Sequence, residues 1–343
     1  MIEQHATLSR QAICQLPKAE LHLHIEGTLE PQLALALAER NHIALPYASL
    51  EELRKQYAFT NLQSFLDLYY QLMGTLKTSE DFRDLMIAYL EHAHDDGVRH
   101  AEIFFDPQVH VHNGLDYNMV LDGLLAGMQY GRENFGITSS LILCIVRDMP
   151  VEDAHRILDL AAPRADELCG IGLDSAEVGY PPELFDEVFA RARAMGLHVV
   201  AHAGEEGPSS YVEQALNILH VERIDHGVRA IDDAQVVQQC ARDRIGMTSC
   251  PLSNRRLQVV DDISKLPLRA LLEAGVPVSV HSDDPAYFGG YIADNYQALA
   301  NIGFSAAELA QFAQHSIETS FIDEHERQTL LKELEQWRAQ YVA

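Results

Sequence analysis

The chain of 343 residues carries 51 acidic and 25 basic side chains, a formal net charge of −26, and 47% of its residues are hydrophobic. An excess of negative charge this large repels phosphate backbones and anionic lipid surfaces, so we exclude nucleic acid polymers and membranes as partners. Five scattered cysteines without a Cys-x-x-Cys pair, and no apolar run of about 18 residues, predict a reduced cytoplasmic protein without disulfides or membrane spans.

Eight short apolar runs, each ended by Gly, Pro or ionisable residues, are typical of β-strands. They cover residues 20–24, 98–105, 138–146, 169–176, 197–202, 222–226, 244–250 and 276–282. Between them the apolar spacing predicts helices over residues 31–40, 62–76, 82–94, 119–134, 154–160, 182–195, 211–219, 234–242 and 266–274. This alternation predicts an α/β fold, a parallel sheet closed as a (β/α)8 TIM barrel, with an open doubly wound sheet as the alternative.

Two stretches depart from an even alternation of strand and helix. Residues 30–97 place several helices in one connection, and residues 305–343 add helices after the last strand. We expect the first stretch to form a helical insertion beside the barrel mouth. Because no low-complexity linker and no internal repeat divides the chain, we expect residues 1–343 to form a single barrel domain.

The first predicted strand ends in two histidines, His22 and His24, one residue apart. Alternate side chains of a strand share a face, so the two imidazoles converge and can bind one metal ion. Later strands also end in ionisable residues: Glu177, His202 with Glu205, His226, and Asp283 with Asp284. Because the chemistry of such a barrel gathers at the C-terminal ends of its strands, these side chains are predicted to share one site.

Three imidazoles and one carboxylate at this end of the barrel suit a single Zn²⁺ that keeps room for a water molecule. The predicted metal ligands are His22, His24, His202 and Asp283. A bound zinc ion lowers the pKa of such a water to about 7. Fe²⁺ is the alternative, because imidazole and carboxylate ligands accept several divalent ions.

One metal ion per chain is predicted. No lysine lies between Lys77 and Lys265, so the fourth strand cannot supply a modified lysine that bridges two ions. Glu177 follows that strand and has two interpretations, a ligand that bridges a second ion or a contact to substrate. We favour the contact to substrate.

Four motifs carry a resemblance to a known family. In chain order they are His22-Leu23-His24, His202-Ala203-Gly204-Glu205, Asp225-His226-Gly227 and Ser282-Asp283-Asp284-Pro285. In this combination, over nearly the whole chain, the sequence resembles the adenosine/adenine deaminase family of the metal-dependent hydrolases. Residues 19–29, 175–179 and 281–291 are most similar to its adenine deaminase branch. The resemblance implies a barrel of the metal-dependent hydrolase type.

The resemblance also implies roles for individual residues. The four predicted ligands would bind zinc, Glu205 would protonate the purine at N1, and Asp284 would form a hydrogen bond with N7. His226 would orient the attacking water, and Asp283 would take part in catalysis as well as in metal binding. Attack at C6 needs a protonated ring nitrogen, which is the chemical reason for an acid opposite the metal. For adenine, in purine salvage, the products would be hypoxanthine and ammonia.

The choice of purine depends on Glu26. Nucleoside deaminases of this family usually have an aspartate here, in a His-Leu-Asp-Gly context that helps to hold the ribose. The longer Glu26 side chain would enter the ribose position and favour the free base, whose N9–H or N3 side Glu177 would contact. In the alternative interpretation Glu26 is a carboxylate that orients His24.

Two other functions stay open at this point. One is a deaminase of an adenine nucleoside, aminodeoxyfutalosine or, in third place, adenosine. The other is a non-catalytic zinc-binding homologue, although the presence of Glu205, His226 and Asp284 disfavours it. A deaminase of the cytidine type is disfavoured because its Cys-x-x-Cys pair is missing. The sequence does not decide between a monomer and a homo-oligomer.

Overall fold

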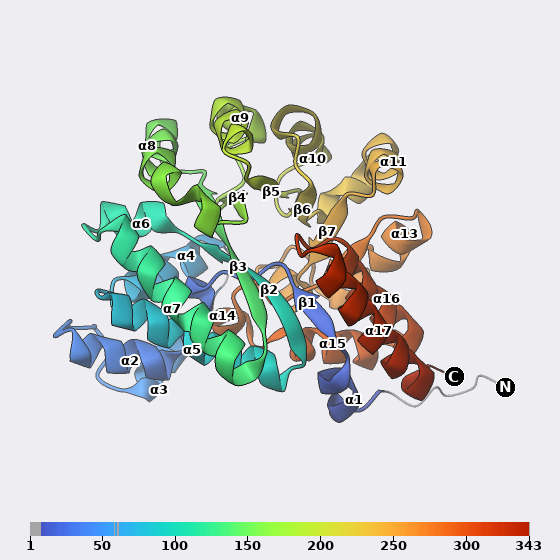
Figure 1. Ribbon diagram of the computed structural model, residues 1–343, viewed down its shortest axis with the longest axis horizontal. Coiled ribbons are helices and arrows are strands. Elements are labelled where there is room, and N and C mark those ends of the chain that lie inside the picture. Colours follow the sequence, from blue (N-terminus) through green and yellow to red (C-terminus); the bar gives the residue numbers. More distant parts are fainter. Residues whose placement is uncertain (1–7, 58, 60–61, 343) are drawn as a thin grey trace.

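The computed structural model describes residues 8–342 except 58, 60 and 61. Eight strands surround a central axis, and helices pack around them (Figure 1). The strands are β1 (Lys18–Glu20), β2 (Val98–Phe105), β3 (Thr138–Val146), β4 (Gly170–Asp174), β5 (His198–Ala203), β6 (Arg223–His226), β7 (Gly246–Ser249) and β8 (Val278–Val280).

The strands pair in parallel with their neighbours in sequence, from β1 to β8. The last strand returns to the first through a single bridge between Leu23 and Asp283. Around this bridge the Asp283 N–H donates to the His22 carbonyl at 3.0 Å, and the His24 N–H donates to the Asp283 carbonyl at 3.1 Å. The sheet is therefore a nearly closed (β/α)8 barrel, which confirms the predicted fold class and excludes the doubly wound alternative.

The bounds of the first strand differ from the prediction. Regular pairing ends at Glu20, whereas the prediction placed residues 20–24 in the strand. Beyond Glu20 the backbone pairs only at isolated bridges, because its groups alternate between two neighbours: Phe104 donates to Leu23 and Asp283 accepts from His24. The pair of histidines thus lies in the gap where the barrel closes.

The helices lie outside the barrel and at its ends. They are α1 (Arg10–Gln15), α2 (Pro31–Arg40), α3 (Leu50–Gln56), α4 (Leu62–Met73), α5 (Ser79–Asp95), α6 (Pro107–His112), α7 (Tyr117–Phe135), α8 (Val151–Ala161), α9 (Asp186–Ala194), α10 (Ser209–Gln214), α11 (Ala234–Asp243), α12 (Pro251–Arg256), α13 (Leu268–Glu273), α14 (Pro285–Phe288), α15 (Ile292–Asn301), α16 (Ala306–Glu318) and α17 (Glu324–Tyr341). Short 3-10 turns are η1 (Glu26–Thr28), η2 (Ala162–Glu167), η3 (Pro182–Phe185), η5 (Val228–Asp232) and η6 (Ile263–Lys265), and η4 (Ala215–Leu219) is a π-helical turn.

The helices α2 to α5 occupy the connection between β1 and β2. One of them, α4, contacts the short helix that follows β8: the rings of Phe65 and Phe288 lie 4.7 Å apart, and those of Tyr69 and Tyr287 lie 5.7 Å apart. This aromatic contact holds α4 beside the C-terminal ends of the strands. Among the described residues, no helix is long and apolar enough to cross a membrane.

The barrel interior carries a small apolar cluster of its own, formed by Phe104, Ile142, Cys144 and Val200. Most other buried apolar side chains belong to one large cluster between the strands and the surrounding helices. Polar groups fill part of the interior as well, because the fully buried Arg223 contacts the carboxylate of Glu102. Arg223 also lies 3.8 Å from Asp225, which connects this polar part to the site described next.

Candidate active site

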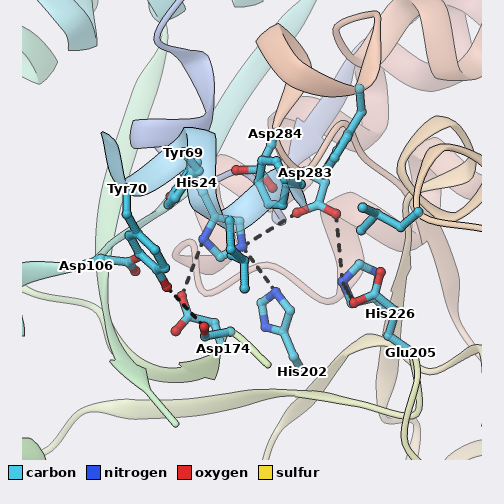
Figure 2. A pocket seen from close by; sticks show the side chains of 15 residues that line it. His24, Tyr69, Tyr70, Asp106, Asp174, His202, Glu205, His226, Asp283 and Asp284 are labelled. Atoms are coloured by element: carbon cyan, nitrogen blue, oxygen red, sulfur yellow. Dashed lines mark hydrogen bonds and ion pairs between the residues drawn. The ribbon is translucent and has the colours of Figure 1, made fainter. Parts of the chain in front are cut away.

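The four predicted metal ligands meet at the C-terminal ends of the strands. Both histidines of the first motif follow β1, His202 lies in β5 and Asp283 follows β8. All four side chains are buried, and Figure 2 shows His24, His202 and Asp283 turned toward one another. Their nitrogen and oxygen atoms lie within 4.8 Å of one another.

The distances between these ligand atoms fit one tetrahedral metal ion. His24 Nε2 lies 3.1 Å from His202 Nε2 and 3.6 Å from Asp283 Oδ1, and His22 Nε2 lies 3.3 Å from Asp283 Oδ1. A tetrahedron with metal–ligand distances of about 2.1 Å has edges of about 3.4 Å. The neutral imidazoles of His24 and His202 can each present the lone pair of Nε2 at this point, so both nitrogens can bind the same ion. The cluster can therefore hold a metal ion.

The charges of the ligands favour metal binding. Burial lowers the pKa of His24 to about 4 and that of His202 well below its usual range, so both rings are neutral at pH 7. Burial alone would raise the pKa of Asp283, but the neighbouring His22 and the other imidazoles hold it well below the usual range. Neutral imidazoles with an ionised carboxylate are the forms that bind a cation.

Two other groups in this region also bring ligand atoms together. One combines His22, Asp283 and His226 with Cys250. Burial raises the pKa of the Cys250 thiol well above its usual range, so the thiol keeps its proton and is a poor ligand. The other combines His24, Asp106 and Asp174. The cluster of His22, His24, His202 and Asp283 is the better metal site, because it offers four ligands and none of them is a protonated thiol.

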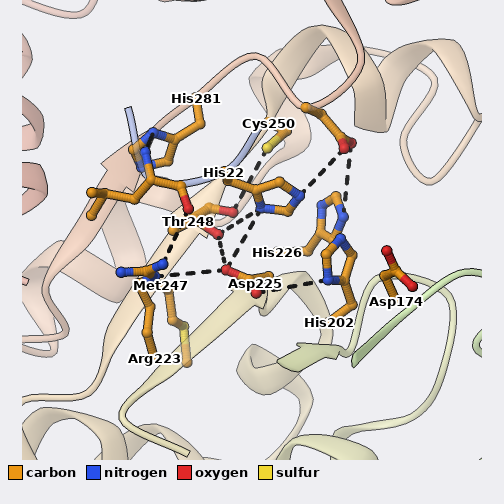
Figure 3. Close-up of polar contacts among 12 residues, drawn as sticks. His22, Asp174, His202, Arg223, Asp225, His226, Met247, Thr248, Cys250 and His281 are labelled. Carbon is orange, nitrogen blue, oxygen red and sulfur yellow. Dashed lines mark hydrogen bonds and ion pairs between the residues drawn. The ribbon is translucent and has the colours of Figure 1, made fainter. Parts of the chain in front are cut away.

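A second layer of polar groups fixes the ligand rings (Figure 3). His22 Nδ1 lies 2.7 Å from the Thr248 hydroxyl, which donates to Asp225 Oδ1 at 3.0 Å. Asp225 Oδ2 also lies 3.7 Å from His202 Nδ1, so one carboxylate serves two of the ligands. Such partners orient metal-binding imidazoles and raise their basicity. Asp225 is in turn 3.8 Å from the guanidinium of Arg223.

Glu205 and His226 lie together beside the metal ligands. Glu205 Oε2 is 3.5 Å from His226 Nε2, which lies 3.8 Å from Asp283 Oδ2. Asn254, on α12, donates to Glu205 Oε1 at 3.3 Å. Burial and the charges of Asp283 and other carboxylates raise the pKa of Glu205 well above its usual range. Glu205 can thus carry a proton into the pocket at neutral pH.

The carboxylate of Glu177 accepts hydrogen bonds from the loop that follows β5. Its Oε1 accepts the N–H of Gly204 at 2.6 Å, and its Oε2 accepts the N–H groups of Glu205, Glu206 and Gly207 at 3.0, 2.9 and 2.8 Å. The side chain is not among the residues that line the pocket. Glu177 therefore holds the loop that carries Glu205.

Glu26 begins the η1 turn and is fully buried. Its Oε1 accepts the N–H of Asp106 at 3.1 Å and contacts His110 Nε2 at 2.8 Å. Its Oε2 is buried without a hydrogen-bond partner. The next residue, Gly27, packs so closely on Asp284 that a Cβ there would lie 2.0 Å from Asp284 Oδ1. The η1 turn, which follows the histidine pair, thus fixes the position of Glu26 and packs against Asp284.

A pocket of about 430 Å³, measured with its mouth, opens over this cluster. It is lined by His24, Phe65, Leu66, Tyr69, Tyr70, Asp106, Asp174, Ser175, His202, Glu205, His226, Leu257, Asp283, Asp284 and Phe288. Its volume suits a small ligand, and its lining combines apolar and aromatic side chains from α4 with a majority of polar and ionisable residues.

The sequence analysis missed two acidic residues of this wall. Asp106 follows β2 and Asp174 ends β4, and Asp174 Oδ2 lies 3.5 Å from His24 Nδ1. Burial raises the pKa of Asp106 well above its usual range and that of Asp174 to about 7. An aspartate at the end of an apolar run is part of the signal that identified Asp283, and it could have found both.

A (β/α)8 barrel with three histidines and one aspartate gathered at its mouth has the architecture of a metal-dependent hydrolase. The family model of adenosine deaminase matches residues 17–337, so the chain belongs to the adenosine deaminase family.

Three known proteins show how similar the chain is to this family. Adenine deaminase of Streptomyces coelicolor is 52% identical over 330 residues, which cover 95% of this chain and 97% of that protein. The crystal structure of adenine deaminase from Arthrobacter aurescens matches with a TM-score of 0.93 at 49% identity, over 94% of this chain and 99% of that one. A zinc-bound amidohydrolase from Burkholderia ambifaria matches with a TM-score of 0.89 at 29% identity, over 99% and 97%.

Proposed function

We propose that the protein is a zinc-dependent adenine deaminase that converts adenine and water to hypoxanthine and ammonia in purine salvage. The observation that carries this proposal is a buried acid, Glu205, beside a four-ligand metal cluster in one pocket. The 52% identity to a relative named adenine deaminase supports the choice of substrate.

Zinc is the proposed ion because three imidazoles and one carboxylate form its preferred ligand set, and a structural relative contains zinc. Fe²⁺ stays the alternative. When bound by His22, His24, His202 and Asp283, the ion would supply a water that loses its proton near neutral pH.

The protein's own residues then handle the protons of the reaction. Glu205 donates to purine N1, so C6 becomes electrophilic as the water attacks. Burial lowers the pKa of His226 to about 3, so its neutral ring can accept a proton from that water and orient it. Burial and the adjacent Asp283 raise the pKa of Asp284 well above its usual range, so its carboxyl group can donate to N7.

The proposed substrate is the free base rather than a nucleoside. Glu26 stays our candidate for restricting the ribose position, and because it does not line the pocket itself, this effect would act through Asp106, whose backbone N–H it accepts. The contact to substrate predicted for Glu177 is less well supported, because four backbone N–H groups already occupy its oxygens. We assign Glu177 the positioning of Glu205 instead. We propose a cytoplasmic protein that acts as a monomer or a homo-oligomer.

One experiment tests the function. Ammonia release from adenine, adenosine and aminodeoxyfutalosine is measured side by side with purified protein of known zinc and iron content. We expect adenine to give the highest kcat/KM. A preference for either nucleoside would replace the substrate proposal, and no turnover by zinc-loaded protein would support a non-catalytic homologue.

A further inference from the structure

The proposed reaction leaves one side of the pocket without a role. Figure 2 shows Tyr70, Asp106 and Asp174 on one side of His24, and Glu205 and His226 on the other. The unassigned side is polar. Its most informative atom is Asp106 Oδ1, because Asp106 lines the pocket, is only 3% exposed and has no hydrogen-bond partner for this oxygen.

Contacts with buried residues fix the backbone of Asp106. Its backbone N–H donates to Glu26 Oε1, and that oxygen also contacts His110, so the backbone of Asp106 is tied to a fully buried pair. Pro107 follows at once and begins α6, which further restricts the chain. A fixed, buried acceptor without a partner is costly in a folded protein. The free oxygen of Asp106 is therefore suited to accept a hydrogen bond from a ligand.

The shape of the purine identifies the donor. If N1 lies at Glu205, C6 lies over the metal cluster and N7 lies at Asp284, then N9 lies at the end of the ring system opposite N1. Asp106 is on the side of the pocket opposite Glu205. In the free base N9 can carry a hydrogen, whereas in a nucleoside it carries the sugar carbon and cannot donate.

We propose that Asp106 accepts the N9–H of the base and so makes the enzyme selective for adenine over its N9-substituted derivatives. This inference rests on the proposed function and names the residue that selects its substrate. A site built to pair a substrate N–H discriminates strongly, because the analogue without it leaves a buried acceptor unpaired.

Other carboxylates near the pocket fit this role less well. Both oxygens of Glu177 accept backbone N–H groups. Asp174 faces His24, a predicted metal ligand, at 3.5 Å. Glu26 is not among the residues that line the pocket, and its Oε1 is already paired. Asp106 and Asp174 both line the pocket, and each has one buried oxygen without a hydrogen-bond partner. Asp174 is already turned toward His24, so Asp106 is the better acceptor for a ligand on the side opposite Glu205.

The test compares adenine with 9-methyladenine, which has no N9–H. Asp106→Ala removes the acceptor and makes room for the methyl group. We expect its kcat/KM for adenine to fall about 100-fold, since an unpaired buried polar group costs about 1–3 kcal/mol. The kcat/KM for 9-methyladenine should rise, because the variant no longer leaves a buried acceptor unpaired beside this substrate. Asp106→Asn keeps a carbonyl oxygen and should restore most of the selectivity. Asp148→Asn, which removes an exposed carboxylate outside the pocket lining, is the matched control.

The outcomes separate this inference from the proposed function. Suppose that wild-type protein deaminates adenine, and that Asp106→Ala lowers kcat/KM equally for adenine and 9-methyladenine or lowers it for neither. Asp106 then does not contact N9, and the inference fails while the proposed function stands. If wild-type zinc-loaded protein does not deaminate adenine, the proposed function fails and the inference with it. Asp106→Leu, an apolar side chain of similar shape, is used if the alanine variant does not fold. The same loss of selectivity is expected of it.

Discussion

The loop that carries the proposed acid depends on a single carboxylate. In Glu177→Gln one side-chain oxygen remains and an NH2 group replaces the other. The amide can take two orientations, and the favoured one keeps its oxygen at the N–H groups of Glu205, Glu206 and Gly207, which all bond one oxygen in the native protein. The NH2 group then faces the N–H of Gly204, which loses its acceptor.

The size of the effect follows from this lost bond. A buried donor without an acceptor costs about 1–3 kcal/mol. We expect the free energy of unfolding to fall by about this amount. We also expect kcat for adenine to fall about tenfold, since a Glu205 that shifts with its loop loses about 1.4 kcal/mol of transition-state stabilisation, the equivalent of a factor of ten. The metal content should not change.

Urea unfolding gives the first quantity and ammonia release the second. Glu206→Gln is the matched control, because its side chain belongs to the same loop but is exposed. An unfolding free energy within about 0.5 kcal/mol of wild type, the size expected of a surface substitution, together with a raised KM for adenine only, would refute the positioning role. That result would return Glu177 to the contact with substrate predicted from the sequence.

Three further variants test the site. Glu205→Gln should keep its metal and lose at least about 100-fold in kcat, because the acid is not a ligand; metal loss by elemental analysis would contradict this. In the wild type, kcat should decline as pH rises through the raised pKa of Glu205, since only the protonated acid donates; a rate that stays flat to high pH would count against Glu205 as the acid. His22→Ala should lose metal first, and retention of stoichiometric zinc would remove His22 from the ligand set. Glu26→Asp should raise adenosine turnover relative to adenine, and an unchanged ratio would end the steric interpretation of Glu26.

Much of the barrel was predictable because its strands are apolar runs that end in Gly, Pro or ionisable residues. The runs at 98–105 and 138–146 match β2 and β3 residue for residue. The first strand was placed too late, since hydropathy does not reveal that regular pairing stops at Glu20 and continues as single bridges. That backbone detail depends on how the last strand meets the first, which is a property of the closed sheet.

The metal cluster was predictable for a geometric reason: the carboxyl ends of parallel strands must meet, so ionisable residues at those ends meet too. Contacts through backbone N–H groups were not predictable. The sequence spacing of Glu177 gives no sign that its partners are the N–H groups after β5. Asn254 on α12 was missed as well, because a lone asparagine within a polar segment resembles ordinary surface.

A series of polar contacts that begins at His22 links the predicted metal ligands to residues near the C-terminus. From Thr248 and Asp225 it reaches Arg223, which donates to the Thr319 carbonyl and contacts Glu102, and Glu102 accepts the N–H of Phe321. Residues just after α16 therefore complete a network whose other end orients a metal ligand. The C-terminal helices are for this reason part of the scaffold of the site, and a variant shortened before Thr319 would leave the buried Arg223 and Glu102 with fewer partners.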